Sequence, residues 1–327
     1  MILNFRFLLS ILLFSIHSYA QQVPAVEENI SNLVTFGKDG EQSWGDDDFS
    51  QTFFFIIPKF QVGSVYIRVF DAETSGENDE KKMDYNTKTK YTIYGGKSCF
   101  TARDVRHNQP QGNYKSGNQL YSKTFGANEI YDGEWYTFGP LNPPEGELVN
   151  EYGGYIFKII AEGISGDDGN LYRYFLSSSP TENKAVEGSN AFTFEYTFRL
   201  SDNQNNTAHL YPYVEENVFS VKISNFDFDN DGHVNIVSMT KKGELSKASG
   251  DNVWAETSHL IVEKEKKTTL DVQFIKNKKV PIRNNNVTLF VTNQDGQLLP
   301  IYTAPIGGIP HHNYKIQFKQ KKKTSPY

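Results

Sequence analysis

The sequence predicts an all-β protein made of two antiparallel β-sandwiches. Aromatic residues form 14% of the 327 residues, with 24 Phe and 19 Tyr, and such side chains suit half-buried strands. Short segments of alternating apolar and polar residues recur along the chain, bounded by Gly, Pro, Asn and Asp. No long segment has helical periodicity. Strands therefore follow strands, which favours antiparallel sandwiches or barrels over a parallel α/β sheet.

The alternation is clearest in residues 191–200, where Phe192, Phe194, Tyr196 and Phe198 fall on one face. Further strands are expected in the first part of the chain at residues 51–57, 64–70, 89–94, 155–161 and 171–176. In the second part they are expected at residues 219–223, 234–239, 259–262, 270–275, 287–292 and 314–318.

Charge divides the chain into two zones. Residues 21–200 hold 26 acidic and 16 basic side chains, whereas residues 201–327 hold 13 acidic and 16 basic. The polar stretch at residues 201–207 coincides with this change and has the composition of a linker. We expect a jelly-roll-like sandwich over residues 21–200, an immunoglobulin-like sandwich over residues 208–320 and a basic tail at 321–327. The alternative is one continuous sandwich with a long surface loop.

The first twenty residues have the features of a signal peptide. Arg6 is their only charged residue, residues 7–14 are apolar, and Ser18-Tyr19-Ala20 places small residues where signal peptidase cleaves. The alternative is a retained anchor, but the apolar run is shorter than the roughly 20 residues that span a bilayer. No later stretch is long and apolar enough to be a transmembrane segment. The protein is expected to be secreted, periplasmic or on the cell surface.

The sequence lacks common enzyme signatures. No GxGxxG follows a strand and opens a helix, and GxxxxGK[ST], HExxH and GxSxG do not occur. A hydrolase stays open as an alternative, because triads and paired carboxylates are recognised by geometry and not by chain order. The single cysteine, Cys99, cannot form an internal disulfide. Beside Phe100 it is expected to be a small buried hydrophobe rather than a reactive thiol.

One acidic loop in the second zone has the spacing of a calcium site. Asp227, Asp229 and Asp231 alternate and are followed by a glycine that permits a tight turn, and calcium takes six to eight oxygen ligands. An EF-hand would need an acidic residue at the twelfth position, which is Ser238, and flanking helices. The loop resembles the DxDxDGxxD calcium loops of FG-GAP repeats, with Asn235 in place of the last aspartate. An ordinary acidic turn is the alternative.

Three acidic clusters lie at predicted strand ends in the first zone. They are Asp46-Asp47-Asp48, the segment 71–80 with Asp71, Glu73 and Asp79, and Asp167-Asp168. Loops at one end of a sandwich can converge, so these carboxylates could together hold one or two calcium ions. The alternative is a set of solvated acidic loops that keep the protein soluble and protect strand edges.

The first zone also resembles a known module. WGDDDFSQTFFFIIPKFQVGSVYIRVFDAETSGENDE, then TKYTIYGGK, and GDDGNLYRYFLSS further on, are similar to N-terminal β-sandwich modules of the pre-peptidase C-terminal type in secreted and outer-membrane-associated bacterial proteins. The resemblance covers roughly residues 31–200. It implies a calcium-binding, jelly-roll-like accessory module and names no ligand or reaction. Residues 208–320 are similar to an immunoglobulin-like domain in size and strand count, but Trp254 has no disulfide to pack on.

The most favoured function is therefore a calcium-stabilised, non-enzymatic binding module for carbohydrate or a cell-envelope protein. Trp44, Trp135 and Tyr136 are candidates for stacking on sugar rings, although they suit a core equally well. A structural component of the envelope and a glycan-active hydrolase are the alternatives. Nucleic acid is not an expected partner, and the basic tail is interpreted as a frayed terminus.

Overall fold

The computed structural model describes residues 22–102, 105, 115–277 and 285–307. Within these ranges the helical elements are three-residue 3-10 turns, and the strand pairs are antiparallel. Two large sheets contain the strands. The predicted all-β, antiparallel, two-sandwich fold is confirmed. The jelly-roll-like and immunoglobulin-like descriptions, and the boundaries near residues 200 and 208, stay predictions.

The first sheet has nine strands. Its order is β17 (Trp254–Leu260), β14 (Ser220–Phe226), β20 (Asn286–Asn293), β12 (Glu195–Leu200), β2 (Ile30–Phe36), β10 (Gly169–Ser177), β4 (Val65–Phe70) and β7 (Trp135–Leu141). The short strand β1 (Gln22–Val23) pairs with β10.

The second sheet has twelve strands. Its order is β16 (Lys242–Ser246), β15 (Gly232–Val237), β19 (Asp271–Lys276), β13 (Thr207–Val214), β21 (Ile301–Tyr302), β11 (Asn190–Thr193), β3 (Ser50–Pro58), β9 (Gly154–Ser165), β5 (Lys88–Gly95) and β6 (Asn118–Phe125). Two short strands extend it, β18 (Thr268–Thr269) on β13 and β8 (Glu147–Val149) on β9.

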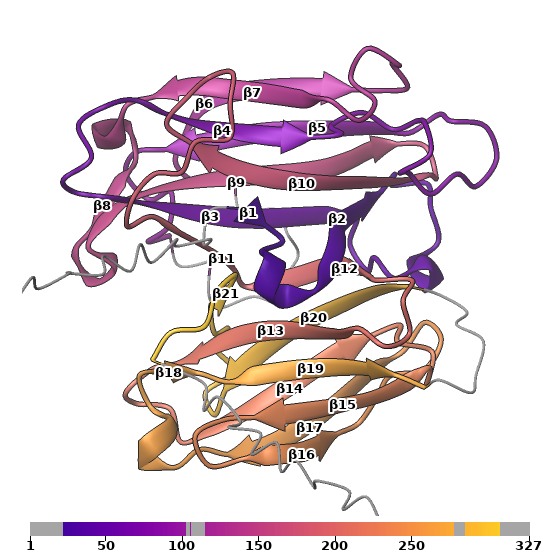
Figure 1. Ribbon diagram of the computed structural model, residues 1–327, viewed down its shortest axis with the longest axis vertical. Coiled ribbons are helices and arrows are strands. Elements are labelled where there is room, and N and C mark those ends of the chain that lie inside the picture. Colours follow the sequence, from indigo (N-terminus) through magenta and orange to yellow (C-terminus); the bar gives the residue numbers. More distant parts are fainter. Residues whose placement is uncertain (1–21, 103–104, 106–114, 278–284, 308–327) are drawn as a thin grey trace, which may run out of the picture.

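Both sheets cross from the first sandwich to the second (Figure 1). The predicted strand 191–200 is divided into β11 and β12, which belong to different sheets. β11 pairs with β3 of the first sandwich and β21 of the second, while β12 pairs with β2 and β20. We call this region, where β11 and β12 join strands of both sandwiches, the seam.

The hydrophobic core continues through the seam. Phe53 of β3 contacts Tyr196 of β12 with ring centroids 5.3 Å apart, and Tyr196 contacts Phe198 at 5.5 Å. Phe198 in turn contacts Phe274 of β19 at 5.5 Å, inside the second sandwich. These rings pack edge to face, which aromatic quadrupoles favour. The apolar face predicted for residues 191–200 is divided between two clusters. Tyr196 and Phe198 lie in the core shared by both sandwiches, whereas Phe192 and Phe194 pack in a separate cluster with Phe54.

Several strands escaped prediction because their sequences do not alternate cleanly. β2 reads ISNLVTF, β6 is largely exposed, and β7 contains Gly139 and Pro140. β13 begins at Thr207, the last residue of the predicted linker. The signal peptide, the strand at 314–318 and the basic tail lie outside the described residues.

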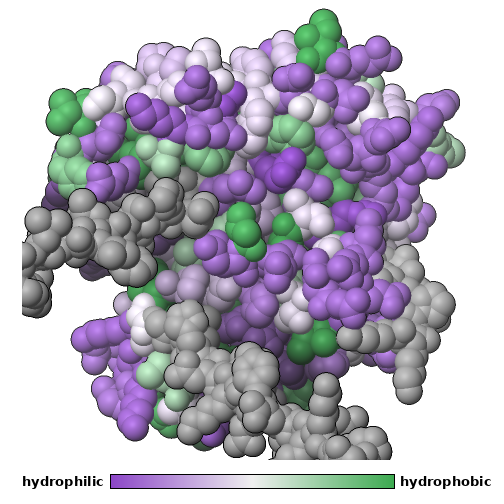
Figure 2. Space-filling view, viewed as in Figure 1, coloured by the Kyte–Doolittle hydropathy of each residue, from purple (hydrophilic) through white to green (hydrophobic). Residues whose placement is uncertain are grey.

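The surface is mostly polar on the side seen in Figure 2. Outside the grey atoms, hydrophobic residues form small separate patches on a hydrophilic face. In the part of the chain that the structure describes, no helix is long and apolar enough to cross a bilayer.

Candidate metal centres and a groove at the seam

Three groups of acidic side chains could each hold a metal ion. In each group the three offered oxygen atoms lie within 4.8 Å of one another. The groups are Asp71 with Glu73 and Asp79, Asp227 with Asp229 and Asp251, and Asp46 with Asp47 and Asp48. Hard oxygen donors at such spacing suit calcium.

The Asp71 group is buried at the end of β4 and is supported by many donors. Asp71 adopts a left-handed conformation and accepts hydrogen bonds from the Gly133 amide and the Asn78 side chain. Glu73 accepts from the Ser75 hydroxyl and the Asn128 amide. The sequence-predicted residues Asp71, Glu73 and Asp79 are therefore brought together on one tightly folded loop.

Burial destabilises the charged forms of these carboxylates. It raises the pKa of Asp71 to about 6, and the pKa of Asp79 lies well above its usual range for the same reason, with Asp71 and Glu73 nearby adding to it. Asp79 still accepts from the Ser75 and Leu171 amides. A divalent cation would favour the ionised forms and turn the repulsion among them into attraction.

Asp167 and Asp168 are not members of that group. Asp168 is fully buried, and its carboxylate accepts hydrogen bonds from the Lys82 and Asn86 amides at 2.9 Å. It holds the turn that precedes β5. Asp167 is half-buried, and its amide donates to the side chain of Asn86. The first-zone acidic clusters thus form separate groups, whereas the sequence suggested that they share ions.

The Asp227 loop brings together a different set from the predicted one. Asp227 and Asp229 have left-handed backbones, which turn their side chains toward Asp251 from the connection between β16 and β17. Asp231 is buried, and its carbonyl accepts from the Asn277 amide. Asn235 lies on β15 opposite Gln273. Asp251 was missed because it is distant in sequence, and no local spacing marks it.

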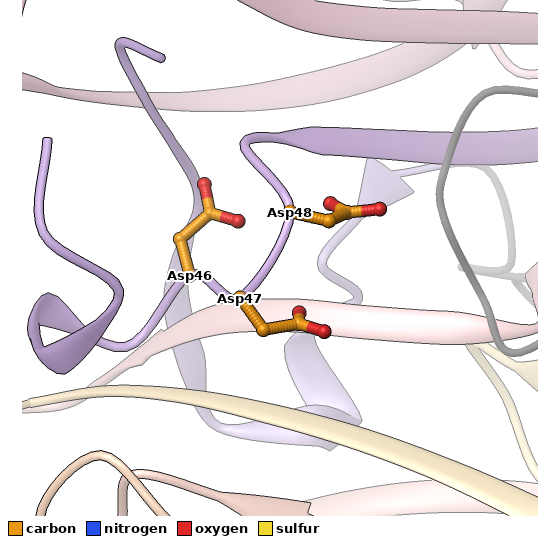
Figure 3. A group of neighbouring side chains, drawn as sticks. All are labelled: Asp46, Asp47 and Asp48. Carbon is orange, nitrogen blue, oxygen red and sulfur yellow. The ribbon is translucent and has the colours of Figure 1, made fainter. Parts of the chain in front are cut away.

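The Asp46 group lies on the loop before β3. Figure 3 shows its three side chains on one turn, with the carboxylates of Asp47 and Asp48 projecting to the same side. Asp46 is fully buried and accepts from the Phe36 and Phe49 amides. Desolvation raises its pKa to about 7, and Asp47 nearby adds to the shift.

That loop is also fixed against the second sandwich. The Asn286 side chain of β20 donates to the Trp44 carbonyl at 2.9 Å, and the Thr288 hydroxyl donates to the Gly45 carbonyl at 3.0 Å. Gly45 has a positive φ, and a Cβ there would lie 2.5 Å from the Asn286 carbonyl oxygen. Only glycine permits so close an approach.

A groove of about 660 Å³ opens at the seam on the twelve-stranded sheet. Its lining includes Ile56, Glu151, Tyr152, Gly188 and Asn190 from the first sandwich and Tyr213, Glu215, Glu216, Asn217, Lys267, Tyr302 and Ile306 from the second. Such a volume suits a small-molecule or oligosaccharide site. None of these residues was predicted, because each half of the chain supplies only part of the wall.

The groove aromatics are held by a packed floor. Phe192 of β11 stacks on Tyr152 with ring centroids 5.4 Å apart and an interplanar angle of 14°. Phe192 also contacts Tyr302 at 5.4 Å, and Tyr302 meets Tyr213 at 5.9 Å.

The sugar-stacking candidates from the sequence lie elsewhere. Trp44 packs on Phe36, and Trp135 packs on Phe70.

One hydrogen-bonded relay has the order of a hydrolase triad. Ser246 Oγ lies 2.8 Å from His259 Nε2, and His259 Nδ1 lies 3.0 Å from Glu244 Oε1. Ser246 and His259 are only 8% and 4% exposed. The residues come from β16 and β17, the edge strands of opposite sheets. We therefore interpret these hydrogen bonds as structural contacts that link the two sheets of the second sandwich.

Cys99 is fully buried, and its thiol donates to the Tyr94 carbonyl. Burial raises its pKa to about 12, which leaves little thiolate at neutral pH. This agrees with the interpretation of Cys99 as a small buried hydrophobe.

No protein-family model matches the chain, and a comparison with curated proteins gives no significant match.

Proposed function

We propose that this chain is an exported, calcium-stabilised, non-enzymatic binding module that takes a carbohydrate in the groove at the seam. The observation that carries the proposal is the groove itself, with Tyr152, Tyr213 and Tyr302 on a packed aromatic floor and three glutamates around them. Aromatic faces suit the apolar faces of sugar rings, and carboxylates accept hydrogen bonds from sugar hydroxyls.

Preorganisation supports this choice. Tyr152 and Tyr302 both contact Phe192, so a ligand would not need to order them on binding. Lys267 forms an ion pair with Glu216 at the groove and adds a donor beside the acceptors. Mixed donors and acceptors beside aromatic rings favour a polyhydroxylated ligand over a purely apolar one.

Calcium has a supporting role in the proposal. The Asp71 group would hold the loop between β4 and β5, and the Asp227 group would hold the turn between β14 and β15. Neither group lines the groove. Calcium would therefore stabilise the sandwiches that form the groove walls without contacting the ligand.

A glycan array with the full chain in calcium tests the proposal, followed by titration calorimetry on any hit. Tyr213→Ala and Glu215→Gln should each weaken binding by about tenfold or more, since a removed stacking or hydrogen-bonding group costs about 1–3 kcal/mol. Tyr66→Ala, at a half-buried tyrosine on β4 outside the groove, is the matched control.

Three outcomes would contradict the proposal. Binding of a glycan that survives both groove substitutions would place the ligand elsewhere. Release of new reducing ends from the bound glycan would instead support a hydrolase that uses groove glutamates. An array without any hit would favour the alternative of a cell-envelope protein partner.

A further inference from the structure

Glu195 is an unusual residue at the centre of the seam. It opens β12 and pairs in register with Phe290 of β20, so it lies where the two sandwiches join. It is only 7% exposed, and among the residues that the structure describes neither of its carboxylate oxygens has a hydrogen-bond donor. A buried, unsatisfied carboxylate costs several kcal/mol unless a proton or a cation compensates it.

The Asp46 group faces this carboxylate. Asp47 lies in contact with Glu195, and Asp46 and Asp48 are near enough to act on its charge. The Oδ1 atom of Asp47 is also buried, and the described part of the chain supplies no hydrogen-bond partner for it. Arg199, the basic residue of β12, is engaged elsewhere, because it pairs with Glu80. Burial and mutual repulsion raise the pKa of Glu195 well above its usual range.

We propose that Asp47, Asp48 and Glu195 bind a divalent cation, best matched by calcium, that joins the two sandwiches at the seam. All the offered atoms are carboxylate oxygens, the donors that calcium prefers. The carboxylate oxygens of Asp46 accept hydrogen bonds from the Phe36 and Phe49 amides, so Asp46 would hold the loop in place beside the ion. This site is independent of the groove and of the proposed carbohydrate binding.

The position of the site gives the cation a mechanical role. Its ligands come from the loop before β3 and from β12, and that loop is already fixed to β20 through Trp44 and Gly45. A bound ion would therefore connect the first sandwich, the shared strand and the second sandwich at one point. The competing explanation is a proton shared between Asp47 and Glu195, which would need no metal.

The three tryptophans of the chain allow each acidic group to be tested separately. Trp44 lies two residues before Asp46. Trp135 pairs with Phe70, which precedes Asp71, and Trp254 pairs with Phe226, which precedes Asp227. Terbium replaces calcium and luminesces when a nearby tryptophan is excited. The full chain is titrated with terbium as wild type and as the Trp44→Phe, Trp135→Phe and Trp254→Phe variants.

We expect Trp44→Phe to remove a distinct part of the terbium luminescence. Glu195→Gln should weaken terbium binding at that site by about tenfold or more, since even changes behind the metal ligands often cost that much. It should leave the signals from Trp135 and Trp254 intact. Glu187→Gln, at an exposed glutamate close in sequence, is the matched control and should change nothing.

Calcium counting by equilibrium dialysis gives a second readout that does not depend on tryptophan. With free calcium near the wild-type Kd of this site, the Glu195→Gln protein should bind less calcium per chain than the wild type. If Trp44→Phe leaves the terbium signal unchanged, or Glu195→Gln keeps the full calcium count, the seam holds no cation. A shared proton between Asp47 and Glu195 is then the explanation, and calcium would raise the unfolding temperature of Glu195→Gln and of the wild type by the same amount.

Discussion

The Asp71 group and the carboxylates at the seam, Asp46, Asp47, Asp48 and Glu195, are both largely buried, but they differ in what surrounds them. In the Asp71 group each carboxylate accepts hydrogen bonds from amides or hydroxyls, including those of Ser75, Asn128 and Gly133. At the seam, Asp46 accepts hydrogen bonds from two backbone amides, whereas no donor within the described ranges reaches Glu195. Burial raises the pKa of carboxylates in both groups, but the donors around Asp71 oppose that shift, whereas Glu195 lacks this compensation.

This difference indicates two kinds of acidic site. The loop around Asp71 is organised by its own hydrogen bonds, so calcium would add to an existing structure. The seam brings carboxylates together from distant parts of the chain and supplies too few donors, so a cation or protons must compensate them. The following experiments test this distinction, beginning with the largest expected effect.

Stability in chelator should fall as pH rises, and the carboxylates at the seam should contribute to this fall. Burial raises the pKa of Asp46 to about 7 and that of Asp47 to about 6, from 3.8. Raised pKa values favour the protonated folded state. The contribution of these protonated carboxylates to the free energy of unfolding is complete below pH 3.8. It is lost as pH rises through the folded-state pKa values of Asp46 and Asp47, at a cost of several kcal/mol. Urea unfolding of the full chain at each pH measures it.

Calcium should reverse this trend near neutral pH, because it binds ionised carboxylates. Calcium and chelator should give nearly equal unfolding free energies at pH 4 and should differ most above pH 7. At calcium a hundredfold above Kd, one site contributes about 2.7 kcal/mol. A chelated protein that becomes steadily more stable from pH 4 to pH 7 would show that the seam carboxylates are not destabilised by charge.

Ser75→Ala should destabilise the protein by about 1–3 kcal/mol, because it leaves the buried Glu73 carboxylate without its hydroxyl donor. The loss should appear in chelator as well as in calcium, since the Asp71 loop is organised by its own donors. Ser43→Ala removes an exposed hydroxyl that bonds Glu41 and should change little. Thermal melts of both variants, in calcium and in chelator, measure the loss of stability. A loss confined to calcium would show that the Asp71 loop also depends on the ion.

Asp251→Asn should weaken calcium binding at the Asp227 loop by about tenfold, equivalent to about 1.4 kcal/mol. Asp231→Asn should have a smaller effect, because Asp231 lies outside the group that the structure brings together. The calcium-induced shift in unfolding temperature measures both. The opposite ranking would favour the ligand set predicted from the alternating aspartates alone.

Cys99→Ala should have the smallest effect, about 1 kcal/mol or less, because it removes one buried sulfur and a weak hydrogen bond to Tyr94. The calcium-induced shift should be unchanged, since the thiol is not in any acidic group. A maleimide should label the folded protein only slowly. Rapid labelling would mean that the thiol is more accessible than its burial indicates.

The structure brings together the three side chains that the sequence grouped around Asp71. Asp71, Glu73 and Asp79 lie within nine residues, so one loop can gather them. The Asp227 prediction was partly matched, because local alternation identified Asp227 and Asp229 and could not identify Asp251 from the next connection. Glu195 was expected on the polar face of an alternating strand. Its burial requires β20 on one side and the Asp47 loop, about 150 residues earlier in the chain, on the other. No local pattern encodes either contact.

The sequence by itself determined the fold class, most strands of both sheets and the acidic loops, because period-two alternation and turn residues act between near neighbours. Tertiary structure alone decided the seam. It divided residues 190–200 between two sheets, buried both faces of that segment and brought Glu195 to Asp47. It also formed the groove, whose lining residues come from both sandwiches. Contacts between residues far apart in the chain depend on how whole sheets pack, and this packing is settled only when the shared core forms.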